Sequence, residues 1–121
     1  MLYAILCYSD EKVVRSLDKA QDDALMAKLT VVHEKLMADG RLGPHFRLMT
    51  TGTAKTVRGL TDPVTDGPFA ETKEQLLGFY VVDCTSLEDA IETARELKGG
   101  ESGGAFEIRP LRLFKPGSRA T

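Results

Sequence analysis

Two apolar stretches constrain the fold most, because each is apolar on both faces of the strand that it is expected to form. Residues 2–8 and 77–84 carry aromatic and β-branched side chains without the alternation that marks a half-buried strand. Strands of this kind are usually buried on both sides. A sheet with helices on one face would leave its other face in water, so we expect a second copy of the chain to cover that face.

The remaining pattern indicates the order of the elements. Apolar residues recur at helical spacing in residues 19–39 and 86–98, and Ser86 is placed to cap the second of these helices. Shorter strands are expected within three further segments: residues 42–51, 55–58 and 105–113. Alternating strands and helices in this order predict an α+β, ferredoxin-like split β-α-β fold, with an antiparallel sheet and two helices on one face.

Residues 64–75 combine a turn with a dense set of charged side chains. Asp66 and Gly67 are typical of a turn, and the spacing of Thr72 and Gln75 allows about one helical turn after it. The candidate ligand-binding residues in this loop are Asp66, Glu71, Lys73 and Glu74. They could bind a small polar ligand or support acid–base chemistry. In the structural alternative, Asp66 caps the turn and Lys73 pairs with a neighbouring carboxylate.

A family resemblance rests on this same loop. Residues 66–76, Asp-Gly-Pro-Phe-Ala-Glu-Thr-Lys-Glu-Gln-Leu, and the Gly-Phe-Tyr of 78–80 resemble the signature of the DGPF family of YCII-related proteins. Residues 56–58 and 107–110 also fit the family's pattern. The resemblance implies a ferredoxin-like fold that dimerises as an α/β barrel, with a function still largely unassigned. It also implies a link with extracytoplasmic-function sigma factors.

The two histidines are weaker candidates. Proteins of the wider YCII group pair a helix histidine with an aspartate beyond the helix, but Lys28 stands near the first position and residues 43–46 contain no aspartate. We therefore transfer no catalytic residue from the family. His33 is expected to be a partly buried helix histidine. His45 could face the same pocket as the central loop, and Arg58 is a further candidate for ligand binding.

Composition narrows the classes of function. The chain has 121 residues, of which 1–113 are expected to form one domain and 114–121 a flexible tail. Its formal net charge of −2 gives no indication of a basic surface for nucleic acid. The apolar N-terminal run is too short for a signal peptide or membrane span, which favours a cytoplasmic location and no membrane partner. Cys7 and Cys84 are expected to be free thiols at opposite ends of the sheet. No spacing indicates a metal site or a cofactor.

The sequence therefore predicts a small cytoplasmic homodimer of unassigned function, with a polar small-molecule pocket beside residues 66–74 that could also be enzymatic. The alternative is a non-catalytic interaction or accessory module linked to sigma-factor regulation. A ligand screen by thermal shift would separate the two, because ligand binding to the folded state raises stability.

Overall fold

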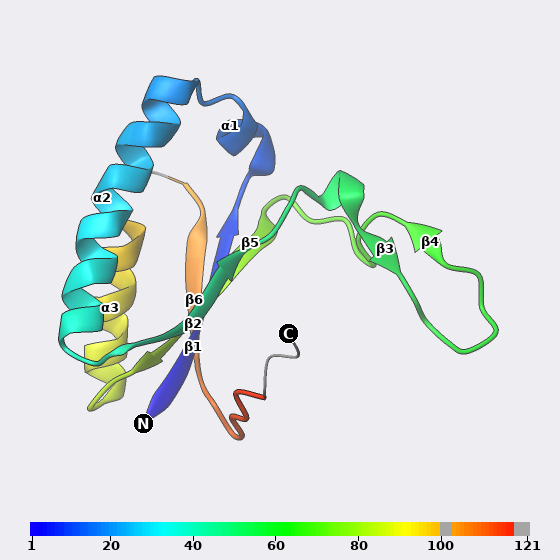
Figure 1. Ribbon diagram of the computed structural model, residues 1–121. Helices are drawn as coiled ribbons and strands as arrows, with labels where there is room; N and C mark the ends of the chain where they lie inside the picture. The colour runs from blue at the N-terminus through cyan, green and yellow to red at the C-terminus, as the bar shows by residue number, and fades with distance from the viewer. Residues whose placement is uncertain (100–102, 118–121) are drawn as a thin grey trace.

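The computed structural model describes residues 1–99 and 103–117. Its elements are β1 (Leu2–Ser9), α1 (Glu11–Arg15), α2 (Lys19–Ala38), β2 (Leu42–Arg47), a 3₁₀ turn (Thr51–Thr53), β3 (Lys55–Thr56), β4 (Thr65–Asp66), β5 (Gln75–Asp83), α3 (Leu87–Lys98) and β6 (Ala105–Pro110). Four strands form an antiparallel sheet in the order β2-β5-β1-β6, and α2 and α3 lie on one of its faces (Figure 1). The expected α+β, ferredoxin-like layout is confirmed.

The two apolar stretches are the central strands of this sheet. They pair with each other in antiparallel register, so that Ala4 lies opposite Val81 and Leu6 opposite Phe79. Successive side chains point to opposite faces. Ile5 and Val82 are fully buried in the core beneath the helices, whereas Leu6 and Phe79 point to the face that carries no helix. We call this second face the open face.

The helices begin where their capping residues predict, with one addition. Ser86 accepts the Asp89 N–H at the start of α3, and Asp18 and Gln21 form a capping box at the start of α2. Residues 9–18, for which no element was predicted, contain α1, which Asp10 caps. A helix of this length is too short to show an apolar period in the sequence.

Residues 48–74 leave the sheet and project away from it, and we call this segment the arm (Figure 1, green). Its tip is a two-residue ladder that pairs β3 with β4. The structure differs from the sequence-based prediction at both ends of the arm. The strand expected in 42–51 ends at Arg47, and the segment after Thr72 is not helical, because Gln75 already begins β5. The turn prediction is confirmed, since Gly67 has a φ of 90°.

The two cysteines lie as expected. Both are free thiols, with Cys7 opposite Gly78 and the Cys84 N–H bound to the carbonyl of Met1 at the other end of β1. The last strand ends at Pro110, three residues earlier than expected. Residues 100–102 of the glycine-rich loop and 118–121 of the expected tail lie outside the described residues. Within the described ranges, no helix is both long and apolar enough to cross a membrane.

We predict that Gly78→Ala destabilises the protein, because β2 passes close to this position of β5. A Cβ atom on Gly78 would lie 2.4 Å from the backbone oxygen of Phe46, and both belong to paired strands that cannot easily move apart. Overpacking of this kind should lower the free energy of unfolding by about 2 kcal/mol. The measurement is urea denaturation followed by circular dichroism, at one fixed protein concentration.

Gly52→Ala is the matched control. A Cβ atom there meets nothing within 4 Å, so its effect should stay within about 0.5 kcal/mol. Equal midpoints for the two variants would contradict the close approach of β2 and β5.

Candidate functional site

Two adjoining cavities lie where the arm leaves the sheet, and together we call them the arm-base pocket. The larger, of about 570 Å³, has a mostly apolar wall that includes Tyr8, Met49 and Phe69. The smaller, of about 340 Å³, is lined by charged side chains: Asp10, Glu11, Lys12, Arg15, Glu71 and Lys73. Both are lined by Thr51, Glu71, Thr72 and Gln75. The pocket therefore has a charged end beside an apolar one.

Glu11 ties the elements around the charged end together. One of its carboxylate oxygens accepts the Thr51 N–H at 3.0 Å, and the other accepts the Thr51 hydroxyl. Its own N–H donates to the side-chain oxygen of Gln75 at 3.0 Å. The hydrogen bonds from Thr51 lower the pKa of this carboxyl group, so Glu11 is ionised although only 9% of its surface is exposed. Glu11 thus joins α1, the base of the arm and the start of β5.

The residues predicted from the central loop do not all meet. Glu71 and Lys73 line the charged end of the pocket. Asp66 lies on the arm, where it pairs with Lys55 across the β3–β4 ladder. Glu74 is not among the residues of the pocket wall, although its carbonyl accepts a hydrogen bond from Thr72. The structure therefore brings together two of the four, and the binding role of all four remains a prediction.

The other two candidates lie elsewhere. Arg58 lines a shallow depression on the arm together with Phe69. His45 lies on the helix side of the sheet, because it pairs with Tyr80 in β5 and its ring stacks on the Tyr80 ring at 5.5 Å. Neither residue lines the arm-base pocket.

Sequence reasoning did not identify Glu11, Lys12 and Arg15 as part of the site. Their helix is short, and Glu11 reaches Thr51 across 40 positions of the chain. The one local signal was Asp10, a helix-capping residue directly after a strand. The structural alternative for Lys73 finds no support in the described part of the chain, where Lys73 has no ion-pair partner.

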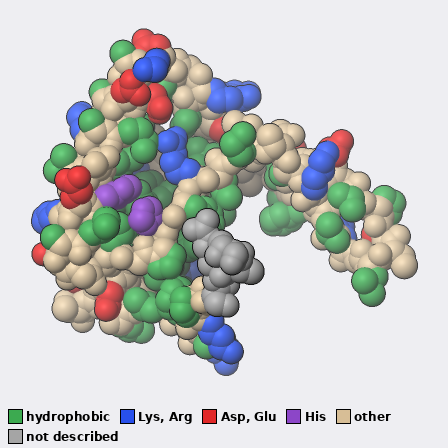
Figure 2. All heavy atoms as spheres, viewed as in Figure 1, with side chains coloured by type: hydrophobic (Ala, Val, Ile, Leu, Met, Phe, Trp, Pro, Cys, Tyr) green, Lys and Arg blue, Asp and Glu red, His purple; other side chains and the backbone are tan. Residues whose placement is uncertain are grey.

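His33, Tyr80 and His45 form a second polar cluster, on the helix side of the sheet. The Nε2 atom of His33 lies 2.9 Å from the Tyr80 hydroxyl, and the two imidazole rings are 5.2 Å apart. Figure 2 shows both histidines at the edge of a hollow between α2 and β2. The prediction that His33 is a partly buried helix residue is confirmed.

Burial favours the uncharged forms of His33 and Tyr80. Desolvation raises the pKa of Tyr80 to about 12. It also lowers the pKa of His33, and repulsion from His45 acts in the same direction. The pair can therefore exchange a hydrogen bond without either ring carrying a charge. Among residues 1–99 and 103–117, no group of three or more histidine, cysteine or acidic side chains is arranged to hold a metal ion.

Comparison with known proteins agrees with this fold and with the motif in the arm. A model of the YCII-related domain matches residues 1–115, which include the whole sheet, both long helices and the arm. The chain belongs to the YCII-related domain family. One similar member is an uncharacterized protein, R00369, of Rhizobium meliloti (strain 1021), which is 50% identical over 120 residues and is matched over 97% of both chains. The resemblance seen in the sequence is thereby confirmed at the level of the family.

We predict that His33 makes this YCII-related protein less stable as the pH falls from 7 to 5. The pKa of His33 is lower in the folded state than the roughly 6.5 of an unfolded chain, so the unfolded state binds more protons in this range. The contribution of His33 to the free energy of unfolding is fully present above about pH 6.5 and decreases as the pH falls below that value. In His33→Gln, which can still bond Tyr80, the melting temperature should depend less on pH between 5 and 7.

The carboxyl groups of Glu11 and Asp89 do not interfere, because their lowered pKa values place their titration at more acidic pH. Melting temperatures measured at one protein concentration would test this. Parallel pH profiles for wild type and variant would show that His33 is not the group responsible.

Proposed function

We propose that this member of the YCII-related family is a homodimeric protein that binds a small polar molecule in the arm-base pocket. One observation carries the proposal: Glu71 and Lys73, predicted as binding residues, line a cavity together with charged side chains of α1. Loops held by a rigid scaffold are frequent sites of ligand binding. The apolar cavity next to this charged end can take the less polar part of the same ligand.

The charges favour a ligand with an anionic group. Each carboxylate oxygen of Glu11 accepts one hydrogen bond from Thr51, which holds this side chain against the base of the arm. Lys12, Arg15 and Lys73 remain as possible partners of an anion, with Glu71 beside them as an acceptor. If the bound molecule has an acidic proton, Glu71 is placed to accept it, which is how the pocket could also support catalysis.

Exposed apolar surface supports the dimer. Met49 and Phe69 of the arm are 78% and 77% exposed, and Phe46 on the open face is 48% exposed. Phe46 packs edge-to-face on Phe79 at 4.1 Å and extends the apolar surface of the open face to the edge strand. A second copy can cover both regions at once, since a twofold axis places the same surfaces of two chains against each other.

The ligand proposal is tested by a thermal-shift screen of small anionic metabolites, followed by calorimetry on the hits. Glu71→Gln and Lys73→Met should each weaken binding by about tenfold or more, because each removes a charged hydrogen-bonding partner. The melting temperature of the free protein should hardly change, because both side chains are exposed.

Asp66→Asn is the control, since Asp66 lies on the arm away from the pocket and should leave affinity unchanged. If both pocket variants bind like wild type, the ligand site lies elsewhere. If no compound raises the melting temperature, the non-catalytic interaction module becomes the better description.

The dimer is tested by light scattering at micromolar concentration, where we expect twice the chain mass of 13.3 kDa. Phe79→Glu should give a monomer or an unfolded chain, because it places a charge in the middle of the open face. Val31→Glu is the matched control, since Val31 is 67% exposed on α2 and lies outside the proposed interface. A wild-type protein with the mass of one chain would overturn the proposal.

A further inference from the structure

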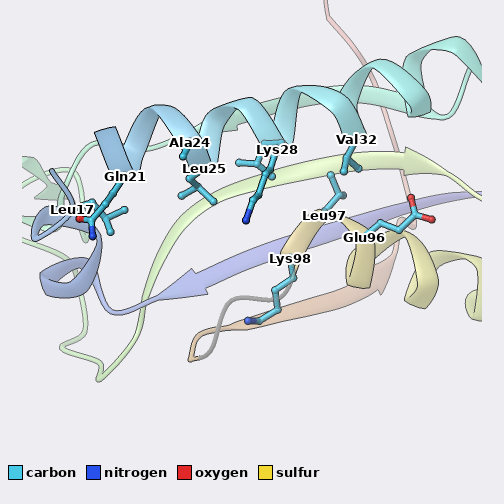
Figure 3. Close-up of a pocket in the computed structure, with 11 residues that line it drawn as sticks. Leu17, Gln21, Ala24, Leu25, Lys28, Val32, Glu96, Leu97 and Lys98 are labelled. Carbon is cyan, nitrogen blue, oxygen red and sulfur yellow. The ribbon is translucent and has the colours of Figure 1, made fainter. Parts of the chain in front are cut away.

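A second internal space lies beneath α2, on the opposite side of the sheet from the open face. A cavity of about 560 Å³ separates α2 from the C-terminal end of α3, and a smaller one of about 140 Å³ separates α2 from the sheet. Both are lined by Leu25, Leu29, Leu97 and Lys98, and the wall of the larger one also includes Lys28 and Glu96. Figure 3 shows side chains of α2 and of the end of α3 directed into the larger cavity. We call the two together the α2 groove.

The α2 groove exists because α2 is only partly packed against the sheet. Leu36 near its C-terminal end is fully buried, whereas Leu25 and Leu29 remain partly exposed. Beneath them, Tyr80 and Phe106 of the sheet form part of the wall of the smaller cavity. Cores of folded proteins are normally close-packed, so an apolar space of this size is more typical of a binding site than of packing.

The mouth of the smaller cavity carries a cation without an acidic partner. Arg47 follows His45 by two residues on β2, so both side chains point toward α2. The Nη1 atom of Arg47 contacts the sulfur of Met26 at 3.2 Å, and Arg47 makes no ion pair in the described part of the chain. A guanidinium group in this situation can bind a carboxylate through two parallel hydrogen bonds.

The histidine cluster lies beside this cation. Because the carbonyl of Gly43 can only accept, His45 donates its Nδ1–H to that oxygen at 3.0 Å. Tyr80, which lines the smaller cavity, is hydrogen-bonded to His33. The groove therefore combines an apolar interior with a cationic, hydrogen-bonding mouth.

We infer that the α2 groove binds an apolar carboxylic acid, with the carboxylate on Arg47 and the hydrocarbon part against Leu25, Leu29 and Phe106. Among the described residues, Tyr8 is the one lining residue that this site shares with the arm-base pocket, and the groove takes a different ligand, one whose bulk is hydrocarbon. The two sites share no residue whose substitution is used to test either of them.

The test measures binding of octanoate to the full chain by calorimetry, with 1-octanol and octylamine as uncharged and cationic analogues. Octanoate should bind saturably, 1-octanol at least about tenfold more weakly, and octylamine not at all. Arg47→Met should reduce affinity for octanoate by about tenfold or more, since it keeps an apolar stem and removes the guanidinium. Arg58→Met, the same change on the arm, should have no effect.

A fluorescence reporter checks the location. The chain has no tryptophan, so Phe106→Trp places a single one at the wall of the smaller cavity. Titration with octanoate should change the emission of this tryptophan, with the dissociation constant that calorimetry gives for the same variant. Lys73→Met should bind octanoate like wild type, which separates this outcome from that of the arm-base pocket. No saturable binding, equal affinity for octylamine, an unaffected Arg47→Met variant or a silent reporter would each overturn the proposal.

Discussion

The pairing of β1 with β5 is the interaction on which the rest of the structure depends. Its register runs from Leu2 opposite Asp83 to Cys7 opposite Gly78, and it decides the face on which every side chain of the two strands lies. Ile5 and Val82 thereby meet α2 and α3, while Leu6 and Phe79 form the open face. A slip of one residue would exchange the two sets. Because both sets are apolar, both faces of the sheet must be shielded from water.

The arm-base pocket follows from how this pairing ends. A bulge after Cys7 shifts the register, so that Ser9 lies opposite Gln75 at the last pair. The chain enters α1 directly after Ser9 and returns from the arm directly before Gln75. The hydrogen bond from the Glu11 N–H to Gln75 joins these two connections, and Thr51 binds the Glu11 carboxylate from the third side. The charged end of the pocket is therefore built where three separate segments converge.

The two helices cover the sheet differently, and the difference creates the α2 groove. On α3 the small residues Ala90 and Ala94 are buried and let the helix lie close to the strands. On α2 the C-terminal half reaches the core, through Leu36, which is fully buried, and Val32, which is partly buried. The N-terminal half is held by its capping box and its backbone hydrogen bonds, which do not require it to touch the sheet. Space therefore remains between Leu25 and Leu29 and the sheet.

Local chemistry was enough for much of this structure. The sequence by itself determined the two central strands, the two long helices, the Ser86 cap, the turn at Gly67 and the ferredoxin-like order, because each depends on residues close together in the chain. The sequence also predicted Glu71 and Lys73 as candidate ligand-binding residues. Only the tertiary structure decided that these two lie with Glu11, Lys12 and Arg15, that Asp66 pairs on the arm, and that His45 lies beneath α2 with His33. Contacts such as Glu11 with Thr51 join segments 40 residues apart, and which segments meet depends on strand register and on the path of the arm. Neither the strand register nor the path of the arm produces a periodic pattern in the sequence, because both result from the packing of the whole chain.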